Sequence, residues 1–137
     1  MASCRVMVVD DNVDAANVVA LAISTLGHEV QVAHSAKDAL VLVESFDYEV
    51  GILDLGMTEM DGLQLCRRLR ARTRVPRPYL VALTGWGRRD DRQRTFEAGF
   101  DEHWTKPADM ERLRQLLDRW PIMASQPRTG DEFIRGT

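Results

Sequence analysis

The sequence predicts an α/β domain in which helices cover both faces of a five-stranded parallel sheet. Five short apolar runs alternate with amphipathic stretches, a pattern typical of successive strand–helix units. Three of these runs, VMVV, VGIL and YLVAL, are almost continuously apolar, as strands buried on both faces are. Right-handed crossovers between the units make such a sheet doubly wound, and ligands then bind at the carboxyl ends of its strands.

Each strand is expected where a short apolar run lies between turn-forming or capping residues. In chain order, the expected strands are Val6–Val9, Glu29–Val32, Val50–Leu53, Tyr79–Leu83 and His103–Thr105.

Each helix is expected where a capping residue precedes apolar residues that share one face. In chain order, the five expected helices start at Asn12 or Asp14, at Ser35, at Asp61, at Asp90 or Asp91, and within Pro107 to Asp109. Ser35 and Asp38 together form a pattern that resembles a capping box. The matching signals toward the helix ends are Leu26 before Gly27, the apolar face Ala39, Leu40 and Val43, Arg72 before Pro76 and Pro78, Ala98 before Gly99, and Trp120 before Pro121.

Length and composition indicate one ordinary globular domain. The chain has 137 residues, of which 45% are hydrophobic and 28% charged. We expect the domain to span residues 1–121, with residues 122–137 as a flexible tail, because that segment has little hydrophobic periodicity. Cys4 and Cys66 lie in apolar contexts and are expected to be reduced, buried thiols in a cytoplasmic protein, or in the cytoplasmic part of a membrane-bound one.

Charge and hydropathy exclude two classes of partner. The net charge of -3 gives no basic footprint for direct nucleic-acid binding. No apolar run approaches the roughly 18 residues of a membrane span. The run of Arg88, Arg89, Arg92 and Arg94 alternates with Asp90 and Asp91, so it is interpreted as a solvated helix face.

Polar residues follow four of the expected strands at their carboxyl ends. They are Asp10 and Asp11, Asp54, Thr84 and Lys106. These residues should meet in one crevice, where three carboxylates would raise each other's pKa unless a cation neutralised them. Oxygen ligands with no nearby His or Cys favour Mg²⁺. The chain has only two lysines, Lys37 and Lys106, so we expect Lys106 to have a role in this crevice and not to be an ordinary surface residue.

Four motifs carry a resemblance to a known family. VVDDN, ILDLGMTEMDG, ALTGWG and AGFDEHWTKP stand in the order and at the separations found in response-regulator receiver domains, over about Cys4 to Trp120. The segment GWGRRDDRQRTFEAGFDEHWTKP is most similar to receivers of hybrid histidine kinases. The resemblance implies a flavodoxin-like (βα)5 fold with strand order 2-1-3-4-5. It also implies phosphorelay signal transduction, with phosphorylation of an aspartate in the presence of Mg²⁺.

Carried over residue by residue, the resemblance assigns the metal and acceptor roles first. Asp54 would accept the phosphoryl group and contribute to the metal site. Asp11 would bind Mg²⁺ directly, Asp10 mostly through water, and the backbone carbonyl of Gly56 would complete the protein ligands.

The resemblance also assigns residues to the phosphoryl group and to the switch. Thr84 and Lys106 would bind phosphoryl oxygens, and Gly85 and Gly56 would let the backbone approach them. Thr84 and His103 would form the switch, and the family holds the Lys106–Pro107 peptide bond in cis.

Three positions depart from the family pattern. Thr58 stands where Pro is usual, and His103 stands where many members have Tyr or Phe, which makes that position titratable. The alternative for His103 is a half-buried strand residue with no signalling role. Trp86 lies two residues after Thr84, and we expect its indole to cover the phosphoryl group and exclude water, with ordinary loop packing as the alternative.

These roles imply that the chain is a signalling module and not an enzyme, apart from assisting its own phosphorylation and dephosphorylation. The donor would be a histidine kinase or a histidine phosphotransfer protein. The downstream protein partner is not identified, and a phosphorylation-dependent dimer is compatible with the pattern. Two alternatives stay open: a magnesium-dependent phosphohydrolase of the haloacid-dehalogenase type, and an interaction module that takes no phosphate.

Overall fold

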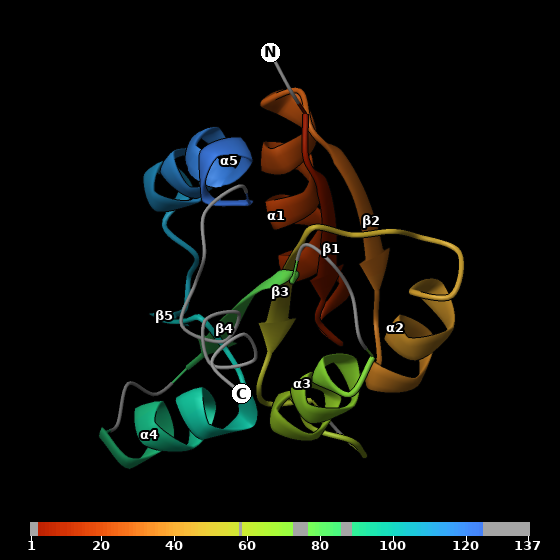
Figure 1. Cartoon of the computed structure of the whole chain (residues 1–137), viewed down its shortest axis with the longest axis vertical. Helices are drawn as coiled ribbons and strands as arrows, with labels where there is room; N and C mark the ends of the chain where they lie inside the picture. Colours follow the sequence, from red (N-terminus) through yellow and green to blue (C-terminus); the bar gives the residue numbers. More distant parts are fainter. Residues whose placement is uncertain (1–2, 58, 73–76, 86–88, 125–137) are drawn as a thin grey trace, which may run out of the picture.

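The computed structural model describes residues 3–57, 59–72, 77–85 and 89–124, and strands alternate with helices throughout this part of the chain (Figure 1). The elements are β1 (Arg5–Val9), α1 (Val13–Thr25), β2 (Glu29–Ala33), α2 (Ala36–Leu42), β3 (Val50–Asp54), α3 (Gly62–Arg70), β4 (Tyr79–Thr84), α4 (Arg89–Ala98), β5 (Glu102–Thr105) and α5 (Met110–Ala124).

The strands form one parallel sheet with the order β2-β1-β3-β4-β5, which confirms the doubly wound α/β prediction and the strand order 2-1-3-4-5. In the pairing register, Leu53 lies opposite Val9 and Asp54 lies opposite Leu83. The carboxyl ends of the central strands therefore lie side by side at one edge, as a ligand site in this fold requires.

Alternate side chains of the strands enter two separate apolar clusters. Val6, Val8 and Ile52 pack with residues of α1 and α5, whereas Met7 and Leu53 pack with residues of α2, α3 and the end of α4. The view in Figure 1 agrees, with α1 and α5 on one side of the sheet and α2, α3 and α4 on the other. Because both faces are covered, the central strands read as almost continuous apolar runs.

Three helices begin at the residues that the sequence indicates. The side chains of Asn12, Ser35 and Asp61 each accept a hydrogen bond from the backbone N–H three residues further on. Such caps satisfy backbone donors at the helix start that have no helical partner. Asp61 thereby fixes the start of α3 close to the end of β3, where the acidic residues lie.

The last helix differs from the prediction because it continues through Pro121 to Ala124. Proline has no N–H to donate to the carbonyl of Leu117, and the thiol of Cys4 donates to that carbonyl instead, at 3.7 Å. The expected tail therefore starts too early, since residues 122–124 are helical; residues 125–137 lie outside the described residues. Smaller differences, such as α3 ending at Arg70 and not at Arg72, are within the usual fraying of helix ends.

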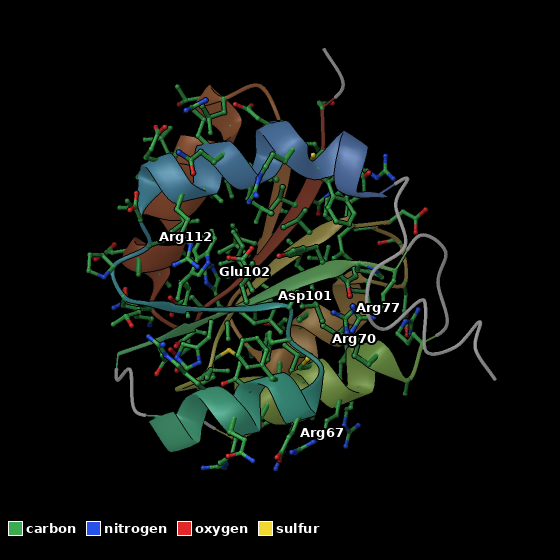
Figure 2. The ribbon with its side chains drawn as sticks, turned by 60° about the vertical axis from the view of Figure 1, so that its left-hand side comes forward. Arg67, Arg70, Arg77, Asp101, Glu102 and Arg112 are labelled. Carbon is green, nitrogen blue, oxygen red and sulfur yellow. The ribbon has the colours of Figure 1, made fainter. Side chains whose placement is uncertain are left out.

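An ion-pair network joins elements at the amino ends of β4 and β5. Asp101 accepts hydrogen bonds from Arg70 and Arg77, both at 2.8 Å, and from the backbone N–H of Leu80. Arg70 also donates to two backbone carbonyls, at Gly99 and Pro78. Figure 2 shows both arginines directed toward Asp101. The network lies at the edge of the sheet opposite the acidic residues, so it supports the fold without entering the site.

Candidate functional site

A cavity of about 490 Å³ opens at the carboxyl ends of the strands. Its lining comes from the ends of β3 and β4, the residues that directly follow β1, β3, β4 and β5, the start of α3 with its capping residue, and α4. The lining residues are Asp10, Asp11, Asn12, Asp54, Leu55, Gly56, Asp61, Leu63, Thr84, Gly85, Arg94 and Lys106. The five polar residues predicted from the strand ends are all among them.

Three carboxylates meet inside this cavity. Oxygen atoms of Asp10, Asp11 and Asp54 lie within 4.8 Å of one another, and Asp10 and Asp54 are buried while Asp11 is exposed. Burial raises the pKa of Asp10, and the charge of Asp54 adds to the effect, although a hydrogen bond from the backbone N–H of Asn12 opposes it. Keeping these carboxylates ionised therefore costs desolvation and repulsion energy, and a bound cation would offset that cost.

Lys106 supplies one positive charge to the cluster. Its Nζ lies 3.0 Å from Oδ1 of Asp54 and 3.5 Å from Oδ2 of Asp10. Burial alone would lower the pKa of Lys106, but hydrogen bonds and charge attraction from Asp54 and Asp10 outweigh it and raise the pKa. One ammonium group beside three carboxylates leaves a formal charge of -2. This excess matches a divalent cation.

The donor set fits Mg²⁺ by its chemistry. The three side chains offer hard carboxylate oxygens that can supply separate ligand atoms, and neither His nor Cys belongs to the cluster. Magnesium prefers such oxygens and keeps several waters, which an open cavity allows. The acidic cluster can therefore hold a divalent metal.

The chain around Asp54 is held by close backbone contacts. Oδ1 of Asp54 accepts a hydrogen bond from the N–H of Gly56 at 3.1 Å. A Cβ atom added at Gly62 would lie only 2.6 Å from the carbonyl oxygen of Asp54 and 2.9 Å from Cα of Leu55. Glycine at this position lets the first turn of α3 approach the end of β3. The capping residue Asp61 predicts where α3 starts, but this contact could not be predicted because it depends on how α3 packs against β3.

Thr84 and Gly85 form the wall of the cavity at the end of β4. Thr84 is buried, and its carbonyl accepts a hydrogen bond from the N–H of Lys106 at 2.7 Å, which ties the ends of β4 and β5 together. A Cβ atom added at Gly85 would meet no atom of the described residues within 4 Å, so packing against them does not require glycine there. The Lys106–Pro107 peptide bond is cis, as the family resemblance implies.

His103 lies outside the acidic cavity. Its imidazole is buried on β5, with Nδ1 3.1 Å from Oγ1 of Thr95 on α4. It lines a second hollow of about 380 Å³ formed by α4, β5 and α5, which includes Arg92 and Arg112. The alternative of a half-buried strand residue is wrong in degree, because His103 is buried, with 8% of the residue exposed, and its ring contacts Thr95 of α4.

Arg94 corrects one interpretation of the arginine run. Its side chain is exposed, as a solvated helix face requires, but it also lines the acidic cavity. Sequence periodicity could not show this, because the orientation of α4 against the strand ends depends on tertiary packing. The interpretations of Trp86 and Thr58 concern positions outside the described residues, as does that of Arg88.

None of the helices that the structure describes has the length and apolar character needed to cross a membrane. This finding agrees with the hydropathy of the sequence.

The sequence matches the response regulator receiver domain family over residues 6–118. The chain belongs to this family, whose members act as phospho-accepting signalling modules in two-component systems.

Individual relatives support the same assignment. The chain is 33% identical over 120 residues to an uncharacterized 14.6 kDa protein of Leptolyngbya boryana, covering 88% of this chain and 92% of that protein. It is 35% identical over 122 residues to the transcriptional regulatory protein TcrA of Mycobacterium tuberculosis, covering 86% of this chain but 47% of the relative. The chain thus spans about half the length of that relative.

Among solved structures, the chemotaxis protein CheY4 of Vibrio cholerae superposes with a TM-score of 0.80 at 24% identity, covering 87% of this chain and 99% of that structure. At this identity the likeness shows the fold.

Proposed function

We propose that Asp54 accepts a phosphoryl group from the phosphohistidine of a histidine kinase or histidine phosphotransfer protein, with Mg²⁺ bound beside it. One observation carries this proposal. Asp54 is buried in the acidic cavity, beside Asp10 and Asp11, and 3.0 Å from the ammonium group of Lys106. A phosphoryl acceptor needs a held carboxylate and nearby positive charge, and this position offers both.

The transfer exchanges one bond to phosphorus for another. A carboxylate oxygen of Asp54 attacks the phosphorus atom, the P–N bond to the donor imidazole breaks, and the nitrogen keeps the bonding electron pair and takes up a proton. The product is an acyl phosphate on Asp54. Later hydrolysis of the acyl phosphate by water returns the carboxylate and releases inorganic phosphate, so the phosphoryl group of the donor ends as free phosphate.

The residues of the cavity divide the work of charge neutralisation and positioning. Asp10 and Asp11, with the carbonyl of Gly56, would hold Mg²⁺, which supplies positive charge to the transferring oxygens when bound. Lys106 would bind a second oxygen, since its ammonium already lies at the carboxylate. Thr84 would donate its hydroxyl to a third, and Gly85 leaves space for the group to approach.

The output would be a change in binding of a protein partner, including a second copy of this chain. Phosphorylation would draw the Thr84 hydroxyl toward the new oxygens and repack the contact of His103 with α4. The buried hydrogen bond between His103 and Thr95 supports this route, because it joins β5 to the helix beside the cavity.

The test is phosphorylation by acetyl phosphate with Mg²⁺, followed by intact-protein and peptide mass spectrometry. The natural chain should gain one phosphoryl group on Asp54, and Asp54→Asn should gain none. Asp118→Asn removes a carboxylate exposed on α5 and serves as the control that phosphorylates normally. Equal labelling of the Asp54→Asn variant would contradict the proposal.

Two further measurements separate the metal from the acceptor. Asp11→Ala should weaken Mg²⁺ binding and slow phosphorylation, because a ligand is lost while the acceptor remains. Sustained hydrolysis of a generic phosphate monoester would instead favour a phosphohydrolase, and an unphosphorylated chain that still binds its partner would favour a simple interaction module.

A further inference from the structure

The cavity has a second cation whose role the proposed function leaves open. Arg94 lines the cavity from α4, whereas Lys106 lines it from the residue after β5. Lys106 is engaged with Asp54 and Asp10. Within the described part of the chain, the guanidinium of Arg94 has neither an ion pair nor a hydrogen bond. An exposed, uncommitted guanidinium therefore borders a site that we propose to carry phosphate.

Guanidinium suits this task better than ammonium. Its planar fork can donate two parallel hydrogen bonds to phosphate oxygens, whereas lysine acts as a point charge. The acyl phosphate would add negative charge to a cavity whose three clustered carboxylates pair, among the described residues, with one cation, Lys106. Arg94 can turn toward that charge at little cost, because its side chain has no other partner among the described residues to give up.

The next residue on α4 connects this position to the rest of the fold. Thr95 is fully buried, and its Oγ1 lies 3.1 Å from Nδ1 of His103 on β5. Adjacent residues of one helix thus face two different surroundings, the acidic cavity and the contact with β5. A bond formed at Arg94 would bear directly on the position of Thr95 against His103.

We propose that Arg94 binds the phosphoryl group carried by Asp54 and so couples phosphorylation to the seating of α4 on β5. The inference rests on the proposed function of Asp54 and adds a phosphoryl-binding residue to it. Arg94 acts on the phosphorylated state and not on the metal.

The test compares Arg94→Gln with Arg94→Lys and a matched control, Arg92→Gln. Arg92 is an exposed arginine on the same helix that lines the other hollow. Titrations measure binding of beryllofluoride in saturating Mg²⁺, and separately the binding of Mg²⁺ alone. Arg94→Gln should weaken beryllofluoride binding about tenfold, because charge-assisted hydrogen bonds are lost. Arg94→Lys should fall between, and Arg92→Gln should match the natural chain.

Binding of Mg²⁺ alone distinguishes a phosphoryl ligand from a structural role. Removing a positive charge beside a cation site should leave Mg²⁺ affinity unchanged or higher in Arg94→Gln. Equal weakening of Mg²⁺ and beryllofluoride binding would mean that the substitution merely disturbs the cavity, and it would overturn the inference.

The coupling is followed through the imidazole NMR signal of His103. In the natural chain this signal should shift when beryllofluoride binds, and the shift should shrink in Arg94→Gln even at saturation. If the natural chain binds beryllofluoride and Arg94→Gln behaves like the natural chain, the inference fails while the role of Asp54 stands. If the natural chain neither binds beryllofluoride nor labels Asp54, the proposed function fails and the inference with it.

Discussion

Lys106 and Thr84 both line the acidic cavity, but they present different chemistry to it. Lys106 contacts the Asp54 carboxylate through a full positive charge, whereas Thr84 offers a neutral hydroxyl from a strand that runs beside β5. The negative charge that spreads over phosphoryl oxygens during transfer depends more on a counter-ion than on one neutral donor. These two residues should therefore fail in different ways when truncated.

We predict that Lys106→Ala slows phosphorylation by acetyl phosphate on the order of a hundredfold. Thr84→Ala should be phosphorylated at close to the natural rate but show a smaller NMR response around His103. The reason is that the missing hydroxyl would otherwise move toward the phosphoryl group and change the packing of His103. Quench-flow labelling with mass detection measures the first effect. Complete loss of labelling in both variants would refute this division of roles.

At the scale of elements, the junction of β3 with α3 leaves no room for a side chain. The added Cβ at Gly62 would press on backbone atoms of Asp54 and Leu55, which cannot move aside like a flexible side chain. We predict that Gly62→Ala destabilises the fold by about 2 kcal/mol, as overpacking does. It should also slow phosphorylation, because the loop after Asp54 must shift.

Gly85→Ala is the matched control for stability, since its Cβ would meet no atom of the described residues within 4 Å. Urea unfolding followed by circular dichroism gives both free energies of unfolding. A loss of stability at Gly85 as large as that at Gly62 would show that local backbone flexibility, and not the contact with β3, sets the effect.

The Asp101 network links α3, the segment before β4 and the start of β5 (Figure 2). The side chains of Asp101 and Arg70 are each 16% exposed, and burial lowers the pKa of Arg70 although the charge of Asp101 opposes it. Truncating one partner of such a pair leaves the other charge buried without a counter-ion. We predict that Asp101→Ala costs about 3 kcal/mol of folding free energy.

Asp118→Ala removes one of two exposed partners of Arg114 on α5, the other being Glu111, and should change the free energy of unfolding very little. The same urea titrations measure this pair of variants. Similar stability of the two would mean that the Asp101 network is solvated and contributes little.

At the scale of the whole molecule, each face of the sheet contains one free thiol. Cys4 belongs to the apolar cluster under α1 and α5, and Cys66 belongs to the cluster under α2 and α3. Burial raises the pKa of Cys66 to about 12 and that of Cys4 to about 11. A raised thiol pKa depletes the reactive thiolate at every pH below it. At pH 8 both thiols should therefore resist alkylation while the protein is folded.

We predict that alkylation of both thiols follows global unfolding, with the same denaturant dependence and little reaction in native buffer even as pH rises from 7 toward 9. Peptide mass spectrometry after timed iodoacetamide exposure measures each site. Modification of Cys66 well before Cys4 would show that the two faces of the sheet open independently.

The chain itself determined the order of the elements and the membership of the acidic cluster. Apolar periodicity and capping residues act between neighbours in the sequence, so the strands and the starts at Asn12, Ser35 and Asp61 could be predicted. The grouping of five polar residues in one cavity could be predicted because the carboxyl ends of parallel strands meet at one edge of the sheet. These residues are Asp10, Asp11, Asp54, Thr84 and Lys106.

The tertiary structure alone decided how helices approach those strands. It brought Arg94 to the cavity, covered His103 with α4, and pressed Gly62 onto the end of β3. It also allows α5 to continue through Pro121. The carbonyl of Leu117, which receives no hydrogen bond from proline, accepts one from the thiol of Cys4. Each of these contacts joins residues from different elements, and their geometry depends on packing angles and depths that the local sequence pattern does not specify.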